Sequence, residues 1–152
     1  MTQTQLTEAD LLAMDGFEQL SAMTDGQLPP APIAVTLGMS NFDVERGTVS
    51  VELKAEHRHY NPLGSVHGGV ISTLLDTAAG CAVHSTLAVG EMYTSLDLTV
   101  KFLRPVTVES GTLRAVGTVL QRGRRTALAE AKLYDEAGKL VAYASSSCMI
   151  FS

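Results

Sequence analysis

Residues 59–83, HYNPLGSVHGGVISTLLDTAAGCAV, decide the fold of this chain. The stretch begins as a polar turn containing Asn61 and Gly64, and it becomes a long apolar run at Val66. Apolar residues in that run cover nearly every side of a helical wheel, which is typical of a buried helix rather than a surface one. A single acid, Asp76, lies in the middle of the run. The stretch therefore predicts a central, buried helix that carries one carboxylate.

Patterns typical of β-strands lie on both sides of this helix. Residues 47–55, GTVSVELKA, alternate between apolar and polar, which predicts a half-buried strand after a turn at residues 45–47. Residues 93–106, YTSLDLTVKFLRPV, predict one continuous strand with Ser95 on its polar face. The apolar face of that strand is expected to carry Leu96, Leu98, Val100 and Phe102.

Three further strand patterns close the chain, at residues 111–123, 124–136 and 140–151. Consecutive strands joined by hairpins predict an antiparallel sheet and therefore an α+β fold. The economical arrangement is a curved sheet wrapped around the central helix. Because one sheet of this size cannot cover both the helix and its own edges, we expect a dimer.

The first part of the chain predicts helices rather than strands. Residues 7 to 24 predict one or two helices with Thr7 and Asp15 as N-caps, and a short helix or turn follows at residues 33–37. The length of 152 residues suits a single domain. We therefore expect one domain, residues 1–152, made of an N-terminal helical extension at residues 1–38 and a core at residues 39–152.

Charge and composition exclude several classes of function. The net charge is −5, so no broad basic surface is available to hold nucleic acid. No apolar run is long enough to cross a membrane, and the first ten residues lack the features of a signal peptide. Cys81 and Cys148 lie far apart in apolar segments, which predicts two reduced thiols in a cytoplasmic protein and no zinc site.

The residues that could take part in a reaction lie at the start and in the middle of the central helix. Gly68 and Gly69 leave the backbone N–H groups of the helix start open to a ligand, at the positive end of the helix dipole. Such N–H groups can stabilise a carbonyl oxygen as negative charge develops on it. Asp76 would cost several kcal/mol in an apolar helix unless it is paired, hydrogen-bonded or exposed at a gap, and we favour a functional acid in a cleft.

The pattern HYNPLGSVHGG…LLDTA, followed by TSLDLTVKFLRP, is similar to that of the hotdog-fold acyl-CoA thioesterases. The phenylacetate-pathway (PaaI-type) branch resembles this chain most, and the resemblance covers about residues 40–151. It implies a hotdog fold, in which a curved antiparallel sheet wraps around a long central helix. It also implies an enzyme that hydrolyses an acyl-CoA thioester to a carboxylic acid and free CoA.

The resemblance also implies a role for each matching residue. Asp76 matches the catalytic acid, as nucleophile or as general base, and Gly68 matches the N–H that polarises the thioester carbonyl. His67 supports that loop, Asn61 positions the water or the thioester, and Ser95 hydrogen-bonds near the acid. In the family the loop of one subunit faces the acid of the other. We therefore expect a homodimer with shared active sites, and a homotetramer built from such dimers.

Substrate binding is less sharply predicted. Phosphates of CoA require a local basic cluster, for which Arg104, Arg124 and Arg125 are candidates, although arginines at a turn are equally typical of a solvated turn. No cofactor is expected, because coenzyme A is part of the substrate. Because the residues near the site are apolar and small on average, the sequence does not decide between an aryl and a short-to-medium acyl group as substrate. Further candidates for substrate contact are Gly69, Leu63, Thr77 and Tyr93.

Two other functions are compatible with the same architecture. Hydratases and dehydratases of acyl thioesters share it, but they need a histidine poised with an acid, and here His67 is followed at once by two glycines. A sensor that binds acyl-CoA without hydrolysing it could dispense with the acid, whereas this chain keeps Asp76, Asn61 and Ser95 together. Hydrolysis is therefore the favoured prediction.

Overall fold

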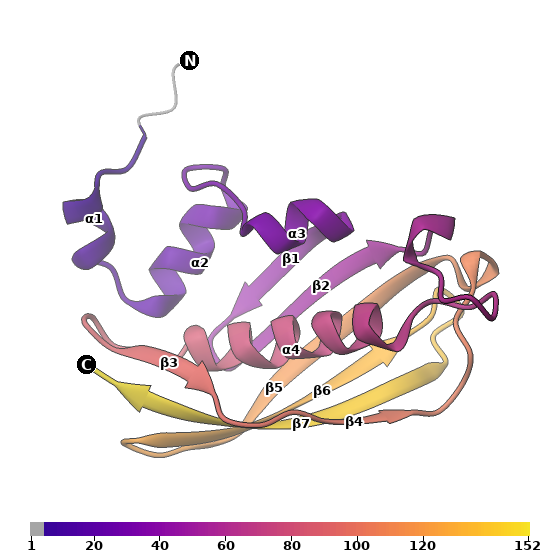
Figure 1. Ribbon diagram of the computed structural model, residues 1–152. Helices are drawn as coiled ribbons and strands as arrows, with labels where there is room; N and C mark the ends of the chain where they lie inside the picture. Colours follow the sequence, from indigo (N-terminus) through magenta and orange to yellow (C-terminus); the bar gives the residue numbers. More distant parts are fainter. Residues whose placement is uncertain (1–4) are drawn as a thin grey trace.

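The computed structural model describes residues 5–152 and contains four α-helices and one seven-stranded sheet (Figure 1). Two short 3-10 turns, His57–His59 and Val108–Ser110, complete the elements. The helices are α1 Glu8–Leu12, α2 Gly16–Thr24, α3 Pro32–Leu37 and α4 Gly68–His84. The strands are β1 Met39–Glu45, β2 Thr48–Lys54, β3 Met92–Ser95, β4 Thr99–Phe102, β5 Thr112–Arg122, β6 Thr126–Tyr134 and β7 Leu140–Phe151.

The sheet is antiparallel and curves around α4, which confirms the predicted α+β architecture (Figure 1). Its strand order is β1-β2-β5-β6-β7-β3, and β4 also pairs with β7, so β3 and β4 follow one another along the same edge. The inner face of the sheet and the facing side of α4 form the core. Its largest fully buried side chains include Leu53, Leu74, Leu75, Leu113, Leu133 and Val141.

Helix α4 begins at Gly68, as the glycine pair predicts, and His67 caps its N-terminus. Its buried side carries large and small apolar residues such as Leu74, Leu75 and Ala78. The opposite side is not covered by this chain, because Thr73, Asp76 and Thr77 are only half-buried. The helix is therefore buried on most sides, as predicted, but not on the side that carries Asp76. The small polar residues of this uncovered side leave room for another element.

The predicted continuous strand at residues 93–106 is wrong, because it is broken between β3 and β4. Ser95 pairs with Cys148 and Thr99 with Ser145, so four steps on one strand oppose three on β7. The extra residue reverses the alternation of side chains. Asp97 holds the irregular segment through its Oδ1, which accepts a hydrogen bond from the Ser147 N–H at 2.8 Å.

This extra residue changes which side chains face the helix. Directly opposed residues of an antiparallel pair lie on the same face of the sheet. Ser95 opposes the buried Cys148, so it faces inward. The prediction that Ser95 lies on the outward, polar face is wrong. Phe102 opposes the buried Ala142 and also faces inward, yet it lies beyond the covered core and is 55% exposed. Leu96 is 58% exposed and lies in the irregular segment, which contradicts its predicted place on an apolar strand face.

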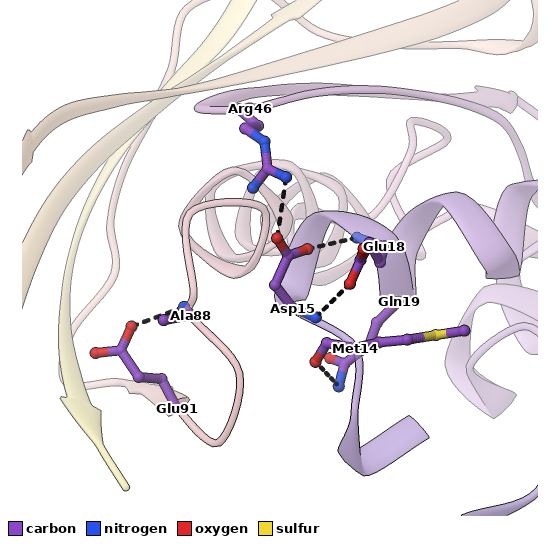
Figure 2. Close-up of polar contacts among 7 residues, drawn as sticks. All are labelled: Met14, Asp15, Glu18, Gln19, Arg46, Ala88 and Glu91. Carbon is purple, nitrogen blue, oxygen red and sulfur yellow. Dashed lines mark hydrogen bonds and ion pairs between the residues drawn. The ribbon is translucent and has the colours of Figure 1, made fainter. Parts of the chain in front are cut away.

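Helix α2 docks on β1 and on the C-terminal end of α4, and α3 docks on β1 (Figure 1). Thr7 and Asp15 cap α1 and α2 as predicted, and each forms a reciprocal capping box. Figure 2 shows the Asp15 carboxylate accepting from the Glu18 N–H at 2.8 Å while its second oxygen pairs with Arg46 at 2.9 Å. The cap thus also ties α2 to the turn between β1 and β2.

Gly117 on β5 is required for the close approach of the sheet to α4. A Cβ added there would collide with the carbonyl oxygen of Ala78 in the helix backbone. We expect Gly117→Ala to lower the free energy of unfolding by about 1–3 kcal/mol, the usual cost of overpacking a core. Urea denaturation measures this cost. Thr118→Ala, next in sequence on the opposite face of the sheet, serves as control, and an equal loss in both variants would contradict the packing argument.

Candidate active site

Asp76 lies at the middle of α4 and is half-buried at the uncovered side of the helix. Ser95 on β3 donates a hydrogen bond from Oγ to Asp76 Oδ1 at 3.3 Å. This contact depends on the strand irregularity, which directs Ser95 inward. The structure thus brings together two of the residues that the sequence predicts for the site.

Tyr93 and Cys81 surround this acid with groups that stay uncharged. Burial, and to a smaller degree the charge of Asp76, raises the pKa of the Cys81 thiol to about 12. Burial likewise raises the pKa of Tyr93 above its usual value. Within residues 5–152, the Tyr93 hydroxyl makes no hydrogen bond to protein. Since neither of these two groups ionises near neutral pH, Asp76 is the candidate reacting group among the three residues.

The Asp76–Ser95 pair opens into a pocket of about 280 Å³. Thr77, Cys81 and Tyr93 also line it, so the predicted substrate residues Thr77 and Tyr93 both reach the acid's pocket. The other side of the pocket is apolar and comes from the N-terminal segment and β1. Those residues are Leu20, Met23, Pro30, Ala31, Ile33, Ala34, Met39 and Phe42.

Asn61 shapes the loop before α4. Its Oδ1 accepts from the N–H groups of Leu63 and Ser65 at 2.9 and 3.2 Å, and its Nδ2 donates to Ser65 Oγ at 3.1 Å. Gly64 completes the turn with a φ of +90°, a conformation that favours glycine. The Asn61 amide therefore holds the loop in this chain, and one of its N–H bonds remains for a ligand.

His67 decides which amide at the helix start is available. Its Nδ1 accepts a hydrogen bond from the Gly69 N–H at 2.8 Å. The Gly68 N–H has no acceptor among residues 5–152, and it lies at the N-terminus of α4, which is the positive end of the helix dipole. Gly68 is therefore the free donor of the pair, whereas Gly69 is occupied in the cap.

Gly68 and Asn61 line a second pocket, of about 310 Å³. Phe102, Leu103 and Arg104 form its other side, and the Phe102 ring lies directly over Gly68. Arg104 is thus the one predicted phosphate-binding residue that the structure brings to the loop. A donor for an oxyanion, an apolar ring and a cation meet at this pocket.

The two pockets hold separate halves of the predicted site. Gly68 and Asp76 are eight residues apart on one helix, which corresponds to about 12 Å along its axis. No residue lines both pockets. One acyl carbonyl cannot contact the Gly68 N–H and the Asp76 carboxylate of the same chain at that separation.

The remaining predicted residues lie elsewhere. Leu63 is 93% exposed at the tip of the loop and lines neither pocket. Arg124 and Arg125 lie at the hairpin between β5 and β6, where they line a pocket with Glu91 and the last residues of the chain. The structure brings none of these three residues to Asp76 or to Gly68.

Sequence reasoning missed the position of Phe102 at the start of α4. Phe102 faces inward, as its place on the apolar strand face predicts, but it lies beyond the covered core and over Gly68 at the start of α4. Sequence reasoning predicted that the N-terminal helical segment covers either the acyl end of the pocket or an interface, without naming residues, and the structure places Leu20, Met23 and Ile33 of that segment in the pocket beside Asp76. Ile33 and Met23 reach the acid's pocket through a docking of α2 and α3 that no local pattern encodes. The apolar side of residues 11–23 was a signal that these helices must pack against something.

Comparison with known proteins identifies the family to which this geometry belongs. Residues 63–142 match the model of the thioesterase superfamily. The chain belongs to the thioesterase superfamily. Two curated relatives are a 1,4-dihydroxy-2-naphthoyl-CoA hydrolase of Listeria monocytogenes and the human acyl-coenzyme A thioesterase 13. The first is 28% identical over 70% of this chain and 85% of its own length, and the second 31% identical over 63% and 68%.

Solved structures place the chain within the PaaI-type branch of hotdog thioesterases. A phenylacetic acid degradation-related protein of Ralstonia eutropha is 34% identical, with a TM-score of 0.75 over 85% of this chain and 97% of that one. The PaaI protein of Escherichia coli is 25% identical, with a TM-score of 0.78 over 93% and 96%. This thioesterase is therefore a hotdog-fold thioester hydrolase. Among its described residues, no helix is both long and apolar enough to cross a membrane.

Proposed function

We propose that this hotdog thioesterase hydrolyses the CoA thioester of an aryl or a short-to-medium acyl group. The observation that carries the proposal is the pairing of Asp76 with Ser95 at the mouth of a mostly apolar pocket. A carboxylate that faces an apolar pocket suits a reaction at the carbonyl of an apolar acyl group. The unpaired Gly68 N–H supplies the complementary donor for the carbonyl oxygen.

Asp76 acts at the thioester carbon in one of two balanced ways. As general base it takes a proton from water while the water oxygen attacks the carbonyl carbon, and the tetrahedral intermediate then breaks its C–S bond so that CoA leaves as the thiol with that proton. As nucleophile its own oxygen attacks, CoA leaves as the thiolate, and water hydrolyses the resulting anhydride. In both cases negative charge develops on the carbonyl oxygen, where the Gly68 N–H stabilises it. Ser95 holds the carboxylate in place through the Oγ–H bond.

The active site is completed by a second copy of the chain. Asp76 in one subunit faces Gly68 of the partner subunit, so each dimer contains two composite sites. Two observations support this arrangement: the separation of the two half-sites within one chain, and the uncovered side of α4. Gly69, Thr73 and Thr77 on that side are small enough for a second helix to approach closely. A homotetramer formed from two such dimers is part of the same proposal.

The basic residues nearest the thioester bind the phosphates of CoA. Arg104 lies beside Gly68 and is exposed, so its guanidinium can reach a phosphate. Arg124 and Arg125 would contribute only if the assembly brings their hairpin to the site. The chemistry uses a carboxylate, water and backbone amides, and so it needs no cofactor. Cys81 and Cys148 are both free thiols, which suits work in the cytoplasm.

Release of free thiol from a panel of acyl-CoA esters tests the proposed function. The panel runs from acetyl-CoA through octanoyl-CoA to palmitoyl-CoA and includes phenylacetyl-CoA and benzoyl-CoA. We expect turnover of aryl or short-to-medium esters and dimers or tetramers in gel filtration. Binding of the esters without thiol release would overturn hydrolysis in favour of a sensor. A monomer with full activity would overturn the composite site.

A further inference from the structure

The N-terminal segment forms one side of the pocket beside Asp76. Six of the lining residues precede β1, and they belong to α2, to α3 and to the connection between these helices. Leu20 and Met23 come from α2, and Ile33 and Ala34 from α3. The pocket therefore lies between the hotdog core and the helices that precede it.

Polarity changes across this pocket in the direction that an acyl thioester requires. Asp76, Ser95 and the Tyr93 hydroxyl lie at the core side, where the reacting carbonyl must be. The opposite side presents only apolar side chains from the N-terminal segment and from Met39 and Phe42 of β1. Hydrocarbon placed there leaves water while the carbonyl stays beside polar groups. The N-terminal segment thus faces the end of the acyl group that is remote from the thioester.

We call the apolar side of the pocket that residues 20–34 form the N-terminal wall. Several contacts fix its position. The Gly16 N–H donates to the carbonyl oxygen of Leu87 at 3.0 Å, and His84 Nε2 pairs with Gln19 Oε1 at 2.8 Å. Leu20 is a buried residue of α2. Arg46 adds a hydrogen-bonded ion pair to Asp15, as Figure 2 shows, and its guanidinium also lies 4.6 Å from the centre of the Phe17 ring. Helix α2 is therefore held in a defined position relative to the core.

We propose that the segment formed by α2 and α3 sets the upper size limit of the acyl group, with Ile33 and Met23 as its specificity-determining residues. The inference rests on the proposed thioesterase function, and it names which part of the chain selects the substrate. A cavity of about 150 Å³ holds benzene. The volume of about 280 Å³ therefore accepts a ring with a short linker or a medium aliphatic chain. Longer acyl groups meet the wall.

Replacement of Ile33 by tryptophan tests the wall, with Val35→Trp as matched control. Both residues lie on α3 and are exposed apolar side chains, at 48% and 66%, but only Ile33 lines the pocket. We expect the ratio of kcat/KM for octanoyl-CoA to that for acetyl-CoA to fall at least about tenfold in Ile33→Trp. Val35→Trp keeps the wild-type ratio. Equal losses for both esters, or no change in the ratio, would overturn the proposal.

A second variant works in the opposite direction. Met23→Ala enlarges the apolar side of the pocket, and we expect it to raise the kcat/KM ratio of dodecanoyl-CoA to octanoyl-CoA by several-fold, at about fourfold per accommodated methylene. A ratio that stays at the wild-type value would contradict a size limit at this wall. Circular dichroism and thermal unfolding check that each variant is folded.

Failure of the proposed function remains distinguishable from failure of this inference. If the wild type releases no thiol from any ester, the thioesterase proposal fails by itself. Calorimetry then compares binding of octanoyl-CoA and of free CoA to the wild type and to Ile33→Trp. A loss of affinity for octanoyl-CoA alone supports the wall, whereas equal affinities of the two proteins for octanoyl-CoA overturn it.

Discussion

Asp76→Asn is expected to lower kcat for thioester hydrolysis at least about a hundredfold, the scale for a positioned acid or base. An asparagine has nearly the same shape, and its amide oxygen can still accept the hydrogen bond from Ser95 Oγ. It can neither attack the carbonyl carbon nor take a proton from water. The fold and the pocket should therefore persist while the chemical step is lost, so KM should change little.

Thiol release under saturating substrate measures this effect. Asp43→Asn provides the control, because Asp43 is an exposed carboxylate on β1 outside both pockets. Urea denaturation of both variants separates lost chemistry from lost stability. If Asp76→Asn retained wild-type turnover, the reacting group would have to lie elsewhere, and the assignment of the acid would be wrong.

Gly68→Pro is expected to lower kcat by about 10²–10³, the usual value of one oxyanion donor. Proline has no N–H, so the substitution removes the donor, while its Cβ meets the Phe102 ring as the Cβ of an alanine would. Gly68 is the first residue of α4, a position at which proline is well tolerated. The preceding His67 already has a φ of −59° and a ψ of 136°, which a following proline accepts.

Gly68→Ala is the matched control, because alanine keeps the N–H. Its Cβ would lie 3.1 Å from Phe102 Cζ, and the exposed Phe102 ring can turn aside. We expect this variant to lose far less activity than Gly68→Pro. Similar losses in the two variants would mean that glycine is needed for space rather than for its N–H.

The central helix and its two chemical positions could be predicted because they depend on local sequence. A glycine pair followed by a long apolar run determines where α4 begins, whatever packs against it. Asp76 stands out in that run because an acid is costly among apolar neighbours. The caps of α1 and α2 at Thr7 and Asp15 were predictable for the same reason, since a capping box lies within four residues.

The inward direction of Ser95 could not be predicted from alternation. The pattern of residues 93–106 is regular throughout, and nothing in it shows that one residue is extra relative to β7. The register comes from pairing with Cys148 and Ser145, which lie about fifty residues later in the chain. The resemblance to the family, rather than the pattern, pointed to Ser95 as a partner of the acid.

The separation of the site into two pockets was also beyond local reasoning. Asn61, Gly68 and Asp76 lie within sixteen positions of one another, yet the rise of α4 keeps Gly68 and Asp76 apart. The N-terminal wall depends on contacts between residues 16–34 and the end of α4. Such long-range docking follows from the packing of whole elements and leaves only a weak amphipathic signal.

Mixed dimers of the two variants test the composite active site most directly. Asp76→Asn and Gly68→Pro chains carrying different affinity tags are co-expressed, and mixed dimers are isolated by both tags in turn. In a mixed dimer one site combines an intact Asp76 with an intact Gly68, and the other site lacks both. We predict about half the wild-type turnover per dimer, since one of the two symmetric sites is restored. Turnover no higher than the average of the two inactive parents would contradict a site shared between subunits.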